Sequence, residues 1–542
     1  MFGPSSVLPI PVIDLPSFVF QADTYDRDKP IYIDALDPSR LYSYNEAKQQ
    51  VSKLVAGFRA AGLVKGDCVL VNSLADIDYS IVFLAIIAAG GIWTGSNPFY
   101  TEKEAKSQLS VTKPKFILSE EEYLDRLLPV VKECGIPATN IFIFDHRSPP
   151  KRADMRSWRV LLDKGEAEWY RISDEPTAKA TIAAYVMSSG TTGLPKAVQV
   201  SHYNFVAEQT VGFEAETRNF EVRRLLCLPQ YATAAIYSNH VCPLRGGEVS
   251  YVMPRFQTES FIRNIEKFQI SELTFMPPMI VSVLNSPLCT ASKFQSVRYV
   301  HGGGAAISKS LQGRMKAFLP AETPFSQIWG MSETCGIAIC LFHPEHDTTG
   351  SIGRLVPNLE AKLIDDNGNE IAEFNRSGEL CIRGPTVMVG YLNNPEATAV
   401  TIDQDGWLQT GDICYCDEKT KKWYIVDRKK ELIKVQGFQV APAELEGILL
   451  NHPDIADAAV VGVNSPSGAT ELPVAFVIRR PGASQLQEQD VVGFVASQVI
   501  SYKRLKGGVH FVESIPKSAS GKVLKNQLRQ QAKVLVRALE KL

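Results

Sequence analysis

The sequence has no excess of charge of either sign. Lysine and arginine together number 57 and aspartate and glutamate 59, which gives a formal net charge of −2 over 542 residues. A chain this close to neutrality has no bulk electrostatic attraction to nucleic acid or to an anionic membrane surface. We therefore expect neither of these as a partner.

Long hydrophobic runs are also missing. The stretch nearest to a membrane span, residues 79–93 (YSIVFLAIIAAGGIW), is shorter than the roughly 18 residues a span requires, and Gly90 and Gly91 interrupt it. We expect a buried helix there that runs into a strand. The N-terminal residues MFGPSSVLPIPVIDLP lack the positive start and long apolar block of a signal peptide. The sequence therefore predicts a cytoplasmic protein without a stable membrane span.

Cysteine and histidine spacings typical of metal sites are absent. The ten cysteines are scattered, Cys414 and Cys416 form only a C-x-C, and the HPEH run at 343–346 is interpreted as a loop. Thiols in this number indicate a reducing compartment. The last three residues, 540–542 (EKL), weakly resemble the S-K-L peroxisomal signal, so a peroxisomal location remains the alternative.

What is present is a chain of several lobes. Residues 40–150 and 181–300 alternate helical patterns with short apolar runs, which predicts parallel α/β layers. After about residue 350, short strands surround an Asn-Gly turn, and CYCDEKTKKWYIVDR predicts a hairpin. The predicted fold class is α/β, with an N-terminal domain (1–427) of two α/β lobes plus a β-barrel-like subdomain. A small α+β C-terminal domain (428–542) follows.

The run MSSGTTGLPK at 187–196 combines small hydrogen-bond donors with one cation. It lacks the G-x-x-x-x-G-K-[ST] spacing of the common nucleotide loop. Glycines let backbone N–H groups approach an anion, and hydroxyls and a lysine add donors and charge. Phosphate binding is one interpretation and a flexible polar loop the other. The candidate residues are Ser188, Ser189, Gly190, Thr191, Thr192, Gly193 and Lys196.

Five further runs occur in a fixed order along the chain. They are QIWGMSET (327–334), GYLNNPEAT (390–398), GWLQTGD (406–412), VDRKKELIKVQGFQVAPAELE (426–446) and PKSASGK (516–522). Together with the first loop they resemble the adenylate-forming superfamily, and among its members the 4-coumarate:CoA ligase type of acyl-CoA synthetase. The resemblance covers nearly the full chain. It implies an AMP-binding N-terminal domain and a mobile C-terminal lid.

The resemblance also implies roles in binding ATP and Mg²⁺. The loop at 188–196 would hold the β- and γ-phosphates, Ser332 would reach the α-phosphate, and Glu333 would be the Mg²⁺ ligand. Asp412 would accept hydrogen bonds from the ribose, and Arg428 would contact ribose or phosphate. Two segments would enclose adenine, and their residues are Gly303, Gly304, Ala305, Gln327, Trp329 and Gly330.

Two lysines are assigned to the two halves of the reaction by the same resemblance. Lys522 would bridge the acyl carboxylate and the α-phosphate, two anions whose approach a cation favours. Lys434, with Gln436, Gly437 and Gln439, would line the pantetheine tunnel of coenzyme A after the C-terminal domain rotates near 427–429. Gly437 suits a thin chain passing close to the backbone.

The acyl pocket is expected around 231–239, 301–306 and 334–338. Ala232 and Gly336 replace a histidine and a proline that are common in relatives, and small residues enlarge a cavity. The candidate pocket residues are Tyr231, Ala232, Ala234, Tyr237, His301 and Gly336. We expect a medium- or long-chain fatty acid or a bulky aryl acid. Alternatively, the two tyrosines and His301 refill the space and keep the pocket aryl-sized.

The expected activity is therefore ATP-dependent ligation of an apolar carboxylic acid to coenzyme A through an acyl-AMP intermediate. A freestanding adenylation enzyme that loads a carrier protein is the alternative. The chain ends twenty residues after Lys522 with no attached carrier domain, which favours the ligase. A luciferase-like oxygenase has no support in the sequence.

Overall fold

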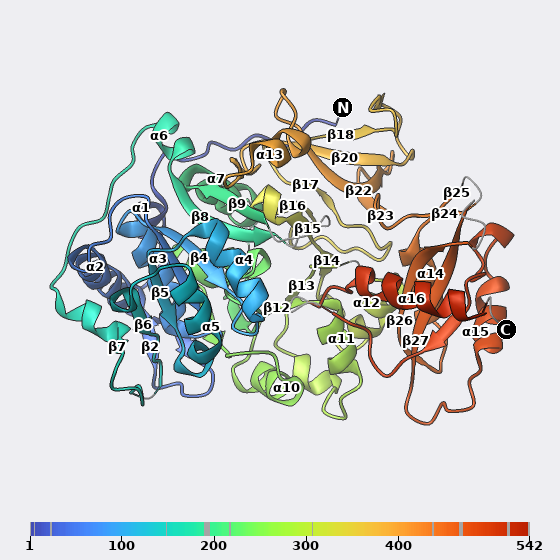
Figure 1. Cartoon of the computed structure of the whole chain (residues 1–542), viewed down its shortest axis with the longest axis horizontal. Coiled ribbons are helices and arrows are strands. Elements are labelled where there is room, and N and C mark those ends of the chain that lie inside the picture. The colour runs from blue at the N-terminus through green and yellow to red at the C-terminus, as the bar shows by residue number, and fades with distance from the viewer. Residues whose placement is uncertain are drawn as a thin grey trace.

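The computed structural model covers the chain, and Figure 1 shows its arrangement. The described residues are 1–542 except 1, 5, 22–23, 148, 189–195, 216–217, 306, 436–437, 466–469, 518–520 and 540–542. The side chains of 439 and 534–539 are also outside the description.

The first lobe is built on an eight-stranded sheet of order β21-β9-β8-β4-β3-β5-β6-β7. Its strands from β3 to β8 are parallel, whereas β9 and β21 pair antiparallel at one edge. The strands are β3 (Cys68–Asn72), β4 (Ile92–Ser96), β5 (Phe116–Ser119), β6 (Ile141–Ile143), β7 (Arg156–Ser157), β8 (Ile182–Ser188), β9 (Lys196–Ser201) and β21 (Gly390–Tyr391). The helices of this lobe are α2 (Tyr44–Ala60), α3 (Ile77–Ala88), α4 (Glu102–Thr112), α5 (Glu121–Glu133), α6 (Glu175–Ala180) and α7 (His202–Glu208).

The second lobe is a seven-stranded sheet of order β14-β13-β12-β10-β11-β1-β2. All neighbours are parallel except β1 and β2. Its strands are β1 (Pro30–Asp34), β2 (Leu41–Ser43), β10 (Arg223–Leu226), β11 (Val249–Val252), β12 (Glu272–Phe275), β13 (Tyr299–Gly302) and β14 (Phe325–Gln327). Its outer helices are α10 (Thr258–Lys267), α11 (Pro277–Leu284) and α12 (Lys309–Lys316).

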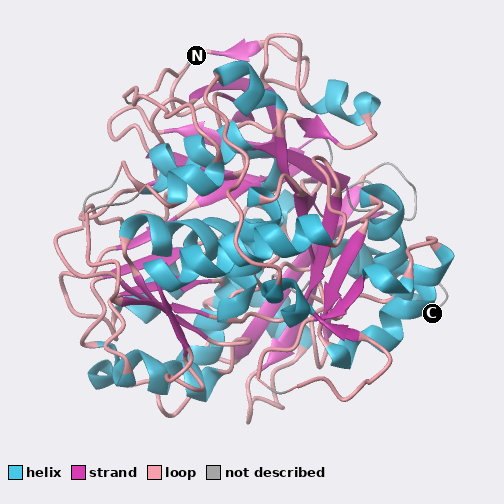
Figure 2. Cartoon of the chain, turned by 90° about the vertical axis from the view of Figure 1, so that its left-hand side faces the viewer, coloured by secondary structure: helices cyan, strands magenta, loops and turns pink. Residues whose placement is uncertain are grey.

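Helix α3 explains the longest apolar stretch of the sequence. Every residue from Ile77 to Ala88 is buried, and the side chain of Asp76 caps the first turn. The helix contacts both β4 of the first sheet and β1 of the second, and Figure 2 shows helices packed between groups of strands. The predicted buried helix leading into a strand is therefore confirmed. Among the described residues no helix is long and apolar enough to cross a membrane.

The barrel-like part consists of two antiparallel sheets. Five strands form the order β19-β18-β20-β22-β23 and three form β15-β16-β17. The hairpin expected in CYCDEKTKKWYIVDR is present as β22 (Leu408–Cys416) paired with β23 (Trp423–Arg428). The other strands are β15 (Trp329–Met331), β16 (Gly336–Cys340), β17 (Arg354–Leu355), β18 (Glu360–Ile364), β19 (Glu370–Ile371) and β20 (Gly378–Arg383).

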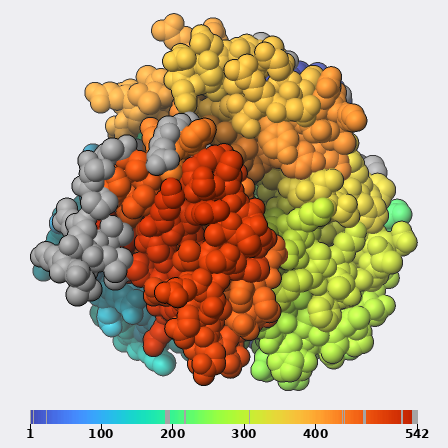
Figure 3. Space-filling model, turned by 90° about the vertical axis from the view of Figure 1, so that its right-hand side faces the viewer, coloured from blue at the N-terminus to red at the C-terminus, as the bar shows by residue number. Residues whose placement is uncertain are grey.

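The C-terminal residues form a smaller α+β unit with hydrophobic clusters of their own. Figure 3 shows this unit seated beside the second lobe and below the barrel-like sheets. Its elements are β24 (Ile433–Val435), β25 (Phe438–Val440), α14 (Pro442–Leu450), β26 (Ile455–Asn464), β27 (Glu471–Arg479), α15 (Glu488–Ala496), β28 (Val509–Phe511) and α16 (Lys525–Leu539). The architecture confirms the predicted α/β fold class.

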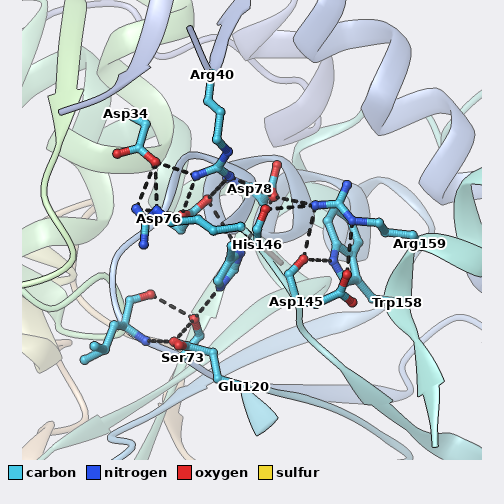
Figure 4. Close-up of polar contacts among 12 residues, drawn as sticks. Asp34, Arg40, Ser73, Asp76, Asp78, Glu120, Asp145, His146, Trp158 and Arg159 are labelled. Atoms are coloured by element: carbon cyan, nitrogen blue, oxygen red, sulfur yellow. Dashed lines mark hydrogen bonds and ion pairs between the residues drawn. The ribbon is translucent and has the colours of Figure 1, made fainter. Parts of the chain in front are cut away.

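A buried charge cluster joins the two α/β lobes where parallel strands end (Figure 4). His146, after β6, lies with Nδ1 3.5 Å from Asp76 Oδ1 and 3.6 Å from Asp78 Oδ2. These three residues are the one metal-like grouping found among the described side chains. Arg40 Nη2, however, lies 3.0 Å from Asp76 Oδ1, and Arg147 Nη2 lies 3.2 Å from Asp76 Oδ2. Because guanidinium groups already bind the carboxylates, we interpret the cluster as structural.

Candidate active site

Glu333 is the centre of the first group of candidate residues. Its Oε1 accepts hydrogen bonds from Ser188 Oγ and Tyr391 Oη, each at 2.8 Å. Ser188 ends β8, Tyr391 lies in β21, and Glu333 belongs to a short 3₁₀ turn after β15. Lys196, at the start of β9, places Nζ 4.7 Å from the centre of the Tyr391 ring. The structure thus brings together both ends of the predicted phosphate loop and the predicted Mg²⁺ ligand.

The loop residues between these two ends lie outside the described part of the chain. They are Ser189, Gly190, Thr191, Thr192 and Gly193. The group around Glu333 fits a Mg²⁺ ion bound together with phosphate, because carboxylate oxygens are the ligands this ion prefers. Glu333 is only 5% exposed, and the Ser188 and Tyr391 hydroxyl groups fix its orientation.

Tyr391 was not assigned a role from the sequence. It is the second residue of the GYLNNPEAT run, and an aromatic residue after a glycine does not by itself indicate a role in binding or catalysis. Ser332, the predicted α-phosphate contact, shares a 2.8 Å hydrogen bond with Thr233 Oγ1, a second residue that the sequence did not single out. Thr233 begins α8 (Thr233–Ile236), within the expected acyl pocket.

Asp412 is the centre of the second group. Its Oδ2 accepts a hydrogen bond from Trp329 Nε1 at 2.9 Å, and Arg428 Nε lies 3.3 Å from its Oδ1. Asp412 and Arg428 are directly paired across β22 and β23. Burial raises the pKa of the Asp412 carboxyl, and it outweighs the opposing effects of Arg428 and Trp329. Apart from the ion pair with Arg428, Asp412 Oδ1 makes no hydrogen bond among the described residues, so it has acceptor capacity left for a ribose hydroxyl.

Trp329 contacts Asp412, the predicted ribose-binding residue, whereas the resemblance placed Trp329 only at the adenine base. Its indole N–H orients Asp412, and its ring is buried in the cluster around β16 and β18. Gln327 also has a definite contact, because its Oε1 accepts a hydrogen bond from Ile307 N at 3.0 Å. It thereby ties the end of β14 to the segment that follows Gly303, Gly304 and Ala305.

The glycines of these segments allow close backbone approach. A Cβ on Gly303 would lie 2.6 Å from Ile328 Cγ1, and a Cβ on Gly330 would collide with the carbonyl oxygen of Gly336. Gly304 has φ +78°, a left-handed conformation that side chains rarely adopt, and faces Met276. Any larger residue at Gly330 would therefore separate β15 from β16.

Lys522 lies on the loop before α16. Burial and the nearby Arg428 lower the pKa of its ammonium group to about 8, although Glu431 and Asp412 oppose the shift. Its electrostatic neighbours thus include both members of the Asp412–Arg428 pair. The C-terminal unit therefore presents this lysine to the candidate nucleotide site.

Lys525, one turn further along, was missed by sequence reasoning. Its Nζ lies 3.2 Å from Glu431 Oε2 and 3.1 Å from Glu446 Oε1, and the side chain is buried. Burial would lower the pKa of Lys525, but Glu446, Glu431 and Asp427 outweigh it and the pKa is raised. This buried cation ties the start of α16 to α14 and to the segment after β23.

Lys434 lies elsewhere on the C-terminal unit. Its side chain is exposed on β24, and its backbone contacts Glu471 and Thr470 at 2.7 and 3.1 Å. Gln436 and Gly437 lie outside the described residues, as does the side chain of Gln439. The predicted coenzyme A cluster is therefore described only through Lys434.

The candidate acyl-pocket residues come from three elements. Ala234 is exposed and Tyr231 and Ala232 are half-buried, whereas Tyr237 is buried and its ring stacks on Phe213 at 5.6 Å. Gly336 starts β16, and a Cβ there would meet the side chain of Glu208. His301 makes different contacts, since its Nε2 lies 3.6 Å from Glu272 Oε1 and its ring packs edge-on against Tyr299.

Comparisons with known proteins agree with this arrangement. Residues 18–392 match the family described as AMP-binding enzyme, and residues 444–522 match the AMP-binding enzyme C-terminal domain. The chain is 46% identical to the phenylacetyl-CoA ligase epaB of Aspergillus niger over 96% of this chain and 97% of that protein. It is 35% identical to a 4-coumarate–CoA ligase of Oryza sativa, covering 96% and 94% of the two chains.

The fold recurs in solved structures. ATP-bound MatB from Rhodopseudomonas palustris superposes with a TM-score of 0.85 at 24% identity, covering 96% of this chain and 99% of MatB. The anthranilate CoA ligase AuaEII gives the same TM-score at 20% identity, covering 98% and 99%. The matched domains and relatives show that this chain belongs to the AMP-binding enzyme family of the adenylate-forming superfamily and is an AMP-forming acid–CoA ligase.

Proposed function

We propose that the chain activates an apolar carboxylic acid with MgATP at the site between Glu333, Asp412 and Lys522, and then transfers the acyl group to coenzyme A. The observation that carries the proposal is the position of Lys522, on the C-terminal unit, beside Asp412 of the N-terminal part and its ion-pair partner Arg428. A cation there can neutralise charge as a carboxylate attacks the α-phosphate.

The residues of the N-terminal part have complementary roles in this proposal. Lys196 and Ser188 bind the outer phosphates, and Glu333 holds the Mg²⁺ that neutralises phosphate charge. Asp412, held by Trp329 and Arg428, accepts hydrogen bonds from the ribose hydroxyls. Substrate binding at these fixed groups places the acyl carboxylate and the α-phosphate together, which removes much of the entropic cost of the reaction.

The second half-reaction requires a different face of the C-terminal unit. Lys434 is exposed on β24, and we propose that residues 428–542 rotate about 427–429 to bring it toward the acyl-AMP. In this proposal residues 1–427 are the adenylation domain. The pantetheine chain would pass along the segment that contains Gln436, Gly437 and Gln439.

The acid itself is proposed to be bulky and largely apolar. The expected pocket contains small residues at Ala232, Ala234 and Gly336, while the Tyr237 ring is buried against Phe213. Among the relatives, one is named a phenylacetyl-CoA ligase and another a nicotinic acid–CoA ligase. An aryl acid fits this aromatic lining better than acetate, and a medium- or long-chain fatty acid remains within the proposed class.

A panel of acids assayed by CoA-dependent AMP release tests the proposal. Bulky aryl acids and C8–C16 fatty acids should exceed acetate and 4-coumarate in kcat/KM. Formation of ADP and phosphate would contradict the adenylation mechanism, and a preference for acetate would contradict the pocket. Loading of a purified carrier protein, measured in parallel, tests the alternative acceptor.

A further inference from the structure

A buried carboxyl group lies against the proposed acyl pocket. Glu208, the last residue of α7, is 0% exposed. Its Oε1 accepts a hydrogen bond from the backbone N–H of Ile337 at 2.5 Å. A Cβ on Gly336 would collide with the same carboxyl group, so the glycine is needed to leave room for it. Sequence reasoning considered only the residues around 231–239, 301–306 and 334–338 and did not include Glu208.

Two polar atoms in this region have no hydrogen-bond partner among the described residues. They are Glu208 Oε2 and the hydroxyl of Tyr237, both shut off from water. The two side chains are near enough for the carboxyl group to influence the pKa of Tyr237, which burial and the nearby Cys335 also raise. More than nine-tenths of buried polar groups in native proteins are hydrogen-bonded, so a neighbouring pair of exceptions indicates a missing partner, either an ordered water or a ligand.

The local backbone also departs from regular structure at both residues. A π-helical turn, Gln209–Phe213, follows Glu208 directly, and Tyr237 begins a second one, Tyr237–Val241. π-Helical turns are rare and are concentrated at functional sites, because the extra residue in the turn redirects side chains. The unpaired groups therefore lie directly before one widened helical turn (Glu208) and at the start of another (Tyr237).

The surroundings of Glu208 disfavour its charged form. Burial raises the pKa of the Glu208 carboxyl well above its ordinary value, and the Ile337 N–H opposes it only in part. The titratable groups that face it are Tyr237 and the thiol of Cys335, and Glu333 lies beyond Cys335. None of these is a cation. With Oε1 occupied as an acceptor, Oε2 is the oxygen that carries the proton in the neutral form of the carboxyl group, and it is then a hydrogen-bond donor.

We infer that Glu208, together with Tyr237, is a specificity-determining residue that donates a hydrogen bond to an acceptor group on the acid, remote from its carboxylate. The inference rests on the proposed acyl pocket and narrows the substrate to a largely apolar acid with a distal hydroxyl, keto or ring-nitrogen acceptor. A pure hydrocarbon acid would leave both buried groups unpaired, which is why such a site discriminates against it.

The test uses matched acids that differ only at the distal end. Suitable pairs are 3-phenylpropanoate with its 4-hydroxyphenyl and pyridyl analogues, and octanoate with 7-oxooctanoate. Acyl-AMP formation is measured as pyrophosphate release, and the ratio of kcat/KM between polar and hydrocarbon members is the readout. For the wild-type chain we expect at least one polar member of these pairs to be favoured about 10- to 100-fold.

Three variants separate the possible explanations. Glu208→Gln keeps the acceptor toward Ile337 and replaces the O–H by an amide N–H donor, so the preference should stay within about threefold of wild type. Glu208→Leu should lower the ratio about 10-fold or more, and Tyr237→Phe should lower it less. Glu214→Gln, which changes a glutamate paired with Arg245 six residues along the chain, is the matched control and should leave the ratio unchanged.

The outcomes distinguish this inference from the proposed function. If the wild-type chain activates acids of the panel but the ratio is near one for every pair, or is unchanged in Glu208→Leu, the inference is wrong and the proposed function stands. The wild-type chain could instead prefer acids with a distal hydrogen-bond donor, while Glu208→Gln prefers acids with a distal acceptor. In that case the wild-type Glu208 is ionised, and the inference is also wrong. If no acid gives acyl-AMP, the proposed function itself fails. Should Glu208→Leu not fold, Glu208→Gln and Tyr237→Phe still decide.

Discussion

Adenylation should weaken as the pH rises through about 8, because that is the pKa to which burial and Arg428 lower Lys522. The lysine acts only as a cation, and a folded pKa below its usual value means that the charge is lost at a lower pH than for an ordinary lysine. With a pKa of about 8, roughly nine-tenths of the chains carry the charge at pH 7 and about one-tenth at pH 9. The expected fall in kcat/KM is therefore nearly tenfold over these two pH units.

The assay is pyrophosphate release at subsaturating MgATP with the preferred acid, from pH 6.5 to 9.5. At subsaturating substrate, kcat/KM reports the protonation of the enzyme before MgATP binds. Lys522→Arg is the matched control, since a guanidinium group keeps its charge throughout this range and should give a flat profile at a lower rate. Lys522→Ala should lose roughly 10²–10³ of the adenylation rate, the value of one transition-state cation.

Two results would refute this reasoning. A wild-type profile that stays flat to pH 9.5 would mean that Lys522 either keeps its proton or is not needed. An equal fall in Lys522→Arg would assign the titration to another group. Thioester formation from supplied acyl-AMP, measured over the same pH range, should not follow the Lys522 titration, because that step does not require the bridge between carboxylate and phosphate.

Three further predictions concern other parts of the chain. Lys434→Ala should slow thioester formation from supplied acyl-AMP and CoA while pyrophosphate release stays within about threefold; equal loss in both half-reactions would contradict separate faces. Lys525→Met leaves Glu431 and Glu446 without their buried cation and should lower the unfolding free energy of the C-terminal unit by about 3–5 kcal/mol in urea, whereas the exposed Lys533→Met should have little effect. Burial lowers the pKa of His146, and three guanidinium groups stand in the same cluster, those of Arg40, Arg147 and Arg159. The carboxylates of Asp76, Asp78 and Glu120 outweigh these effects, so the folded pKa is raised. Its stabilisation is then complete below the unfolded value of about 6.5 and is lost as the pH rises through the raised folded value, so the difference in urea unfolding between wild type and His146→Gln should shrink as the pH rises above about 6.5.

The parts of the fold that were predictable are those in which local pattern and tertiary structure agree. The apolar run at 79–93 could only be buried, and α3 followed by β4 fulfils that expectation. The run CYCDEKTKKWYIVDR predicts a hairpin, and the pairing of β22 with β23 confirms it. In both cases the structure is determined by a few consecutive residues, so the sequence alone is sufficient to predict it.

The groups that were missed are polar residues whose meaning depends on distant segments. Tyr391 and Ser188 are 203 residues apart in the chain, yet both donate to the same oxygen of Glu333. In the sequence Glu208 is an ordinary helix glutamate. In the fold β16 covers it and excludes water from its carboxyl group. No periodicity or short motif records which side chain will be buried by such a contact, and a chemical role follows from burial as much as from residue type.

Burial and neighbouring charges have different effects on the two lysines near the start of α16. Lys525 and Lys522 are three residues apart and both are removed from water, but their pKa values move in opposite directions. Lys525 lies among three carboxylates, so its charge is stabilised by the unit itself and holds the helix in place. Lys522 is largely buried and faces Arg428, so the pKa of its ammonium group stays lowered until an anion arrives. The phosphates of ATP and the acyl carboxylate supply that anion, and their binding should therefore stabilise the arrangement in which the C-terminal unit is closed on the nucleotide site.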